Sequence, residues 1–533
     1  MMSAAPNSSG DGDPVVKSVV AVPVAGVGGG SATSCEQEAS PLESSPMQTS
    51  RSTPFIATTP NTPHRRAILA AACGQVNARA LGVGLLAAVL AVHAADGTLA
   101  AAVPAAPPER IRVVFLVAEF PDLSLGRPRQ YFTDPAQRSG LVERLVDYYA
   151  EVSHGRLEIQ ATIATDVVTV AQPQVRYVQR PAQLIRDAFR AFAAAGGDPA
   201  AQAAVETADA LIVFFAGPGK ESDLHGKAND PWSNFTGIEP PIETAGGHRI
   251  QKGCVIAADQ REGLSSFGVL CHEFGHLLGL PELYAPGGAT HEGIGVWGLM
   301  GQGTWLGRGD RPPQVSAWCK LAMGWTEPEL VERSGRVTLP AIDRSGRVIK
   351  LWAHGPERPA EYYLIENRQR RDADARLPGS GLLIWRVDER VEGVRSSQSD
   401  PEHMRLTLMQ ADGRDDLRIG HRAGGNRGDA SDPWRGMDRV RRRLLDGAAV
   451  AGALLLAVAA LRPVRRRMLL AALGVLGLGA GLGISRSPTF VAHDPVRGGS
   501  PPAAASPSFV IGDISASGDP MTFTVTLGNA GGG

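Results

Sequence analysis

The stretch CHEFGHLLGLPELY, residues 271–284, decides how the surrounding chain must fold. On a helix, residues i and i+4 share one face, so His272 and His276 can present two imidazoles to one ion. Glu273 is turned by about 100° from His272, which puts its carboxylate beside the ion rather than on it. This H-E-x-x-H spacing is typical of a helix that holds zinc, with the glutamate as general base.

The ends of this helix and a third ligand are also predicted from the residues. Ser265 and Ser266 offer N-caps, and Gly279 is suited to the left-handed conformation that ends a helix. Pro281 prevents the helix from restarting. The chain then turns back, so Glu282 is expected as third ligand, which leaves a fourth position for water. A surface helix with a solvated glutamate is the alternative explanation of the motif.

A glycine-rich segment, GIGVWGLMGQGTW at 293–305, follows the helix and carries Met300 at its centre. A methionine turn beneath the zinc is a feature of the metzincin group, in which Met300 would be structural and not a ligand. Ordinary core packing is the alternative for this methionine. His291 is a second candidate for the third ligand.

Several further stretches carry a resemblance to a known family. They are FLVAEFPD (115–122), VDYY (146–149), EVSHG (151–155), FFAGPG (214–219), the HEFGHLLGLPELY stretch, 295–325, YLIENR (363–368), LPGSGLLIW (377–385), QADGR (410–414) and the segment around Asn426.

With these stretches the chain resembles the immune inhibitor A family of secreted bacterial zinc metallopeptidases. The resemblance implies a zincin-like α/β (α+β) catalytic domain and zinc-dependent endopeptidase activity on protein or peptide substrates. The resemblance also implies that His272, His276 and an acidic third residue bind the metal. The family usually has aspartate where this chain has Glu282, which keeps the charge but lengthens the arm.

Composition limits the function classes. With 533 residues the chain has room for two or more domains, and its formal net charge of −1 gives no electrostatic case for nucleic acid. Five cysteines do not make a disulfide-dense scaffold, and the pairing of Cys254, Cys271 and Cys319 is left open.

The N-terminal part is expected to direct export. Residues 1–64 are rich in Ser, Pro, Thr, Gly and Ala, which predicts a disordered leader. Residues 65–95 combine two arginines, an apolar stretch and a small-residue end, as in a signal peptide or an N-terminal anchor. A linker at 96–109 follows. A secreted or extracytoplasmic protein is expected, free or attached to a membrane.

Alternating strand and helix patterns predict the catalytic domain at 110–330. Strands are expected at 111–120, 157–170 and 208–216, and helices at 141–152 and 181–195. The polar stretch 230–233 is expected as a loop, which the resemblance would place near the substrate cleft; a simple surface loop is the alternative.

The character of the chain changes after about residue 335, where short strand patterns predict a β-rich domain at 331–437 that continues at 487–533. Strands are expected at 337–339, 348–351, 362–366, 381–387 and 405–409, and a pair at 509–514 and 521–527. Oxygen ligands for calcium are available in this region, although a solvated polar loop is the stronger alternative. The candidates are Asp412, Asp415, Asp416, Asn426, Asp429 and Asp432.

An apolar insertion at 438–486 interrupts the β-rich pattern. Its two runs, 447–461 and 468–484, are separated by an arginine-rich stretch and favour helices. Each is shorter than the roughly 20 residues that a spanning helix prefers, so a membrane hairpin is a hypothesis for this block.

Two other functions fit parts of this pattern. Intramembrane proteases of the site-2 family combine H-E-x-x-H with a Leu-Asp-Gly motif, and Leu445-Asp446-Gly447 begins an apolar run here. Pro281, Glu282 and the charged residues 259–262 bound the histidine helix too tightly for a membrane span. A surface-attached binding protein with a dead peptidase domain is the second alternative, against which the intact His272, Glu273 and His276 argue.

Overall fold

The computed structural model describes residues 108–126, 134–223, 229–285, 291–356, 358–391, 398–436, 488–492 and 508–528. The expected leader (1–64), signal peptide or anchor (65–95) and apolar insertion (438–486) lie outside these residues. Within them, no helix has both the length and the apolar character that crossing a bilayer requires. The described residues fall in one unit of the chain.

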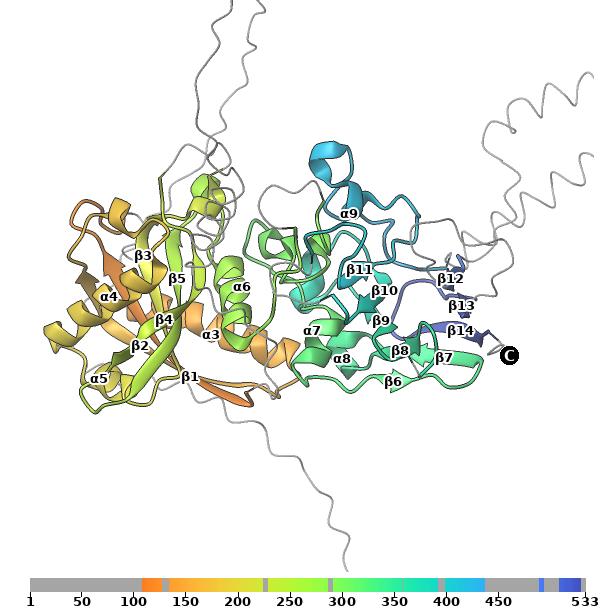
Figure 1. Ribbon diagram of the computed structural model, residues 1–533, viewed down its shortest axis with the longest axis horizontal. Coiled ribbons are helices and arrows are strands. Elements are labelled where there is room, and N and C mark those ends of the chain that lie inside the picture. The colour runs from red at the N-terminus through yellow and green to blue at the C-terminus, as the bar shows by residue number, and fades with distance from the viewer. Residues whose placement is uncertain are drawn as a thin grey trace, which may run out of the picture. The chain divides into compact units, whose positions relative to one another are not determined.

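The first sheet has five strands in the order β2-β1-β3-β5-β4 (Figure 1). Its strands are β1 (Arg110–Glu119), β2 (Glu158–Thr169), β3 (Ala210–Pro218), β4 (Asn234–Glu243) and β5 (Arg249–Asp259). The inner pairs are parallel, whereas β4 runs antiparallel to β5 and forms one edge. Strands β1 to β3 agree with the strands predicted at 111–120, 157–170 and 208–216.

Helices and short helical turns lie between these strands and after them. The helices are α3 (Pro135–Val152), α4 (Pro181–Ala195), α5 (Pro199–Val205), α6 (Phe267–Leu278), α7 (Ala317–Ala322), α8 (Ile342–Ser345) and α9 (Asp416–Ile419). The 3-10 turns are η1 (Gln174–Tyr177), η2 (Lys220–Ser222), η3 (Arg261–Gly263), η4 (Gly295–Trp297), η5 (Gln302–Trp305), η6 (Asp372–Arg376) and η7 (His421–Ala423). The predicted helices at 141–152 and 181–195 are confirmed as the major part of α3 and as α4.

The ends of α6 follow the prediction at the C-terminus but not fully at the N-terminus. Gly279 takes the left-handed conformation with φ 106° and closes the helix. At the other end, the Ser265 hydroxyl accepts a hydrogen bond from Phe267 N–H at 3.2 Å, whereas Ser266 makes no side-chain cap. The expected capping role of Ser266 is therefore wrong. The next free donor, Gly268 N–H, bonds instead to the Gly309 carbonyl at 2.7 Å.

Two further sheets build the C-terminal half. One has the order β11-β10-β9-β8-β6 and the other β12-β13-β14-β7. Their strands are β6 (Glu329–Leu330), β7 (Gly335–Leu339), β8 (Ile349–Trp352), β9 (Glu361–Arg368), β10 (Gly381–Asp388), β11 (Leu406–Leu408), β12 (Phe490–Ala492), β13 (Phe509–Gly512) and β14 (Met521–Leu527). The predicted pairing of 509–514 with 521–527 is confirmed as the antiparallel pair β13–β14.

Strand β9 is buried on both faces, because its side chains alternate between two cores. Tyr362 and Leu364 belong to the same core as the first sheet and α6. Tyr363 and Ile365 belong to a second core shared with β13 and β14. The mixed α/β class is thus observed, and one hydrophobic core extends from β1 into β9 and β10. The division into a domain at 110–330 and another at 331–437 and 487–533 stays a prediction.

Two helical glycines give a sharp test of this packing. A Cβ atom at Gly268 in α6 would lie 2.1 Å from the Thr304 carbonyl oxygen and 2.9 Å from that of Gly309. Both obstacles are backbone, so we expect Gly268→Ala to destabilise the protein by about 1–3 kcal/mol. A Cβ at Gly140 in α3 meets nothing within 4 Å.

Gly140→Ala is the matched control, expected to stabilise the protein by about 0.5–1 kcal/mol because alanine restricts the unfolded chain. Urea denaturation of both variants measures the difference. Equal stability of the two variants would mean that α6 does not lie against the 304–309 segment.

Candidate metal centre

Three predicted ligands converge beside α6. His272 and His276 lie one helical turn apart, with their Nε2 atoms 3.1 Å from each other. Glu282, in the segment after α6, places Oε1 3.1 Å from His276 Nε2 and Oε2 3.4 Å from His272 Nε2. The three residues offer ligand atoms that all lie within 4.8 Å of one another, so this group could hold a metal ion.

Backbone carbonyls fix the orientation of both imidazoles. His272 Nδ1 lies 3.0 Å from the Leu299 carbonyl oxygen, and His276 Nδ1 lies 2.8 Å from that of Leu280. A carbonyl oxygen only accepts, so each Nδ1 donates to its carbonyl and each Nε2 faces the shared centre. Thr304 Oγ1 donates to the same Leu299 oxygen at 3.0 Å.

Glu273 lies beside this centre, next to β4, the edge strand of the first sheet among the described residues. Its Oε2 accepts a hydrogen bond from the Phe235 backbone N–H of β4 at 2.7 Å. Burial raises the pKa of Glu273 to about 7, although the neighbouring histidines act in the opposite direction. A carboxylate with a pKa in this range can exchange a proton near neutral pH.

The ligands themselves are strongly coupled by charge. Burial alone would lower the pKa of His272, but the Glu282 carboxylate outweighs it and raises the value to about 9. Burial would raise the pKa of Glu282, but the two histidines hold it well below its usual range. Oε2 of Glu282 is buried and has no hydrogen-bond donor among the described residues. The group therefore presents an anionic oxygen to the space between the imidazoles.

Tyr284 is a member of the site that the sequence analysis did not single out. Its hydroxyl donates to Glu282 Oε1 at 2.9 Å, and its ring centroid lies 6.0 Å from that of His272. A donor on a ligating carboxylate orients it toward the ion. The signal was present in the stretch 271–284, which ends at Tyr284, but only the fold shows that the phenol turns back toward Glu282.

Met300 is completely buried beneath the helix. A Cβ atom at Gly275 would lie 2.6 Å from Met300 Sδ, so the sulfur lies directly against the helix backbone before His276. The Met300 carbonyl also accepts a hydrogen bond from Leu283 N–H at 2.9 Å. The role of Met300 as a methionine turn stays a prediction, with ordinary core packing as the alternative.

His291 and the cysteines lie outside the cluster. His291 is buried, and its Nδ1 accepts from Gly293 N–H at 3.3 Å. Cys254, Cys271 and Cys319 are each buried and unpaired with one another. Burial raises the pKa of all three thiols, which keeps them protonated and poor ligands.

The calcium candidates are partly brought together. Asp412, Asp416 and Asp429 offer oxygens within 4.8 Å of one another, and Asn426 Nδ2 donates to Asp416 and Asp429 at 3.0 and 2.9 Å. Asp432 instead accepts from the Trp297 indole, and Asp415 pairs with Arg418. Exposed acidic groups often cluster without an ion, so calcium binding stays a prediction.

The third ligand can be tested by metal retention. Replacing Glu282 with alanine removes the only carboxylate of the three-residue group, so we expect zinc to be lost on dialysis against a weak chelator. Tyr284→Phe keeps all three ligands and is expected to weaken zinc binding by about 10- to 100-fold. Zinc content and chelator competition measure both effects.

Asp446→Ala is the matched control, because Asp446 is the third ligand in the intramembrane alternative and lies outside the described residues. It should retain zinc. Loss of zinc from Asp446→Ala, with retention in Glu282→Ala, would favour the intramembrane site.

Comparison with known proteins agrees with this geometry. Residues 249–326, which include β5, α6 and Met300, match the model of the immune inhibitor A peptidase M6 catalytic domain. A 105-residue stretch is 30% identical to the pre-pro-metalloprotease PrtV of Vibrio cholerae serotype O1 (strain M66-2), covering 19% of this chain and 9% of that protein. A 237-residue stretch is 26% identical to immune inhibitor A of Bacillus thuringiensis subsp. alesti, covering 36% of this chain and 34% of that protein.

The chain thus aligns with about a third or less of the length of these relatives, and the activity of the whole chain is a proposal. The matched family segment contains all three predicted metal ligands, His272, His276 and Glu282, together with the predicted base Glu273. The resemblance to the immune inhibitor A peptidases, expected from the sequence, is confirmed.

Proposed function

We propose that this chain is a zinc-dependent endopeptidase that hydrolyses peptide bonds of protein substrates outside the cytoplasm. The observation that carries the proposal is the convergence of His272, His276 and Glu282 beside a buried Glu273. The family match implies a metallopeptidase and supports this choice.

The distances fit a tetrahedral zinc ion. Zinc–ligand bonds of about 2.0–2.1 Å at tetrahedral angles separate neighbouring ligand atoms by roughly 3.3 Å. The observed separations are 3.1 Å between the two Nε2 atoms, and 3.1 and 3.4 Å between these nitrogens and the Glu282 oxygens. Two imidazoles and one carboxylate form a donor set that is typical of catalytic zinc. We propose that His272, His276 and Glu282 hold it.

Each residue then has a defined task. Zinc, when bound, supplies a positive charge that acidifies a water molecule and polarises the scissile carbonyl. Glu273 takes a proton from the attacking water and passes it to the leaving amine. Phe235 N–H holds one carboxylate oxygen at 2.7 Å, which leaves the other oxygen to face the water. Tyr284 keeps the Glu282 carboxylate turned toward the histidines.

The free edge of β4 suits an extended peptide substrate. In the sheet of described residues β4 pairs with β5 on one side only, and Phe235 N–H bonds to Glu273 rather than to another strand. Exposed strand edges bind peptides by adding a strand through main-chain hydrogen bonds. Such binding accepts many sequences, which fits an endopeptidase acting on proteins.

The remaining parts of the proposal rest on the sequence. Action outside the cytoplasm rests on the signal-like segment 65–95, and membrane attachment through 447–461 and 468–484 stays a prediction. Among the described residues the group is formed by His272, His276 and Glu282, while the insertion with Asp446 lies outside these residues. The family match does not favour the intramembrane alternative.

Casein hydrolysis by the full chain tests the proposal. Glu273→Gln should lower the rate by about 10²- to 10⁴-fold, because the amide cannot accept the proton from water. Its zinc content should stay unchanged, since Glu273 is not one of the three ligands. Glu143→Gln, an exposed glutamate of α3, is the matched control and should keep full activity.

Two results would contradict the proposal. Hydrolysis that persists in the Glu273→Gln variant would exclude Glu273 as the general base. A folded, zinc-loaded wild type that cleaves neither casein nor denatured protein would favour the dead, surface-attached binding protein.

A further inference from the structure

The turn at 295–301, here called the floor turn, delivers the carbonyl that orients His272. Leu299 is completely buried, and its carbonyl oxygen lies 3.0 Å from His272 Nδ1. A ring held at one nitrogen keeps the other nitrogen aimed at the metal centre. Whatever fixes the floor turn therefore fixes this ligand.

Residues far along the chain hold the floor turn in place. Val296 N–H donates to the Arg427 carbonyl at 2.8 Å, and the Trp297 indole donates to Asp432 Oδ2 at 2.8 Å. The Trp297 carbonyl accepts from Arg368 Nη1 at 3.2 Å. These three bonds all come from the chain after β8, beyond the matched segment 249–326.

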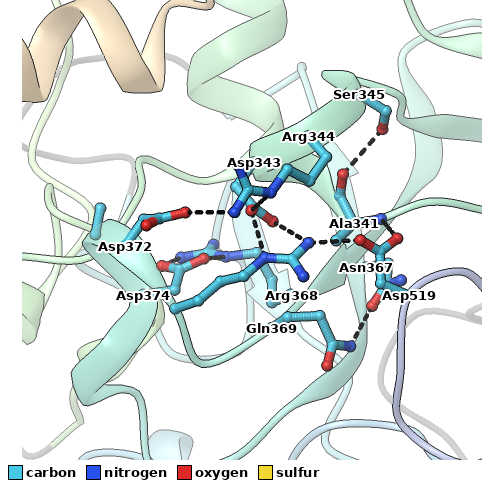
Figure 2. Close-up of polar contacts among 12 residues, drawn as sticks. Ala341, Asp343, Arg344, Ser345, Asn367, Arg368, Gln369, Asp372, Asp374 and Asp519 are labelled. Carbon is cyan, nitrogen blue, oxygen red and sulfur yellow. Dashed lines mark hydrogen bonds and ion pairs between the residues drawn. The ribbon is translucent and has the colours of Figure 1, made fainter.

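Arg368, at the end of β9, is fully buried, with a side chain that is 0% exposed. Its Nε donates to Asp374 Oδ2 at 2.6 Å, and its Nη1 reaches Glu366 Oε1 at 3.2 Å as well as Trp297. Figure 2 shows Arg368 beside Asp374. A planar guanidinium can satisfy two carboxylates and one carbonyl at once, which an ammonium cannot do from the same place.

Asp374 connects the same ion pair to the floor turn by a second route. Its Oδ1 accepts from Gln314 N–H at 3.0 Å, and the Gln314 carbonyl accepts from Leu299 N–H at 3.3 Å. The Arg368–Asp374 pair thus reaches both Trp297 and Leu299. The two routes end at the Trp297 carbonyl and the Leu299 N–H, which lie just before the carbonyl that faces His272.

We propose that Arg368 is a positioning residue for the metal centre, which holds the floor turn so that the Leu299 carbonyl orients His272. The metal site then includes β9 and the segment that leads to Asp432. This inference rests on the proposed function only where its test measures peptide cleavage. The zinc-binding arm is independent of catalysis.

The test compares Arg368→Lys with Arg371→Lys in the full chain. Arg371 lies three residues on, and its bonds go to Asp343 and Asp519 at 2.6 Å each, whose carboxylates Figure 2 labels. Both substitutions keep the charge and shorten the polar head. Only Arg368→Lys removes a bond to the floor turn.

We expect Arg368→Lys to raise the zinc dissociation constant by about 10- to 100-fold, as measured by chelator competition on the folded protein. The absorption bands of the cobalt-substituted protein should shift, because the His272 ring is freed to rotate. On a fluorogenic peptide, kcat should fall while KM stays close to the wild-type value, since β4 is unchanged. Arg371→Lys should match the wild type in all three measurements.

A second variant guards against misfolding. Arg368→Met combined with Asp374→Asn removes both charges of the pair, which leaves Lys320 and Glu366 as buried charges of opposite sign. It should show the same loss of zinc affinity.

Unchanged zinc affinity and cobalt spectrum in either folded variant would overturn the proposal. So would failure of both variants to fold while Arg371→Lys folds, because Arg368 would then serve folding and not positioning. A wild type that binds zinc tightly but cleaves no peptide would contradict the proposed peptidase activity. The positioning role of Arg368 would then still be tested by the zinc affinities. A wild type that binds no zinc would refute both.

Discussion

An imidazole that binds a metal through one nitrogen almost always has its other nitrogen held by a hydrogen bond. Here that constraint is met by two backbone carbonyls, Leu280 for His276 and Leu299 for His272. The Leu280 carbonyl comes from the turn that ends α6, so His276 is oriented by its own helix. The Leu299 carbonyl comes from the separate floor turn, so the geometry of His272 depends on how the rest of the chain packs around that turn.

Much of that packing is polar and buried. Lys320, Glu366, Arg368 and Asp374 all lie at 0–1% exposure near the floor turn. Burial lowers the pKa of Lys320 to about 8 and raises that of Glu366, so both charged forms are disfavoured by their surroundings. A hydrophobic cluster of similar volume is often as stable as such a group of charges. The directional bonds instead select one arrangement of β9 against the turn.

The sequence was sufficient for the parts of this site that depend on residue type and spacing. The i, i+4 histidines, Gly279 and Glu282 lie within eleven residues and predicted the helix, its end and the third ligand. The hairpin β4–β5 was missed, because Gly237, Pro240 and Pro241 interrupt the strand pattern of β4. Leu299 and Phe235 contribute backbone groups, which no residue type reveals. Arg368 and Tyr284 belong to the stretches 363–368 and 271–284. The partner of Arg368, Trp297, is distant in sequence, and Tyr284 reaches Glu282 only because the chain turns.

Phe235 N–H connects the base to the strand that would align the substrate. The bond to Glu273 Oε2 uses a donor on the edge of β4 that pairs with no other described strand, the same edge on which an extended peptide would form main-chain bonds. The position of the base along the edge is therefore set by the strand itself and not by a side chain. In the proposed peptidase, a peptide registered on β4 would meet Glu273 at a fixed residue of the strand, so recognition of the main chain would also set the distance between the scissile bond and the proton acceptor.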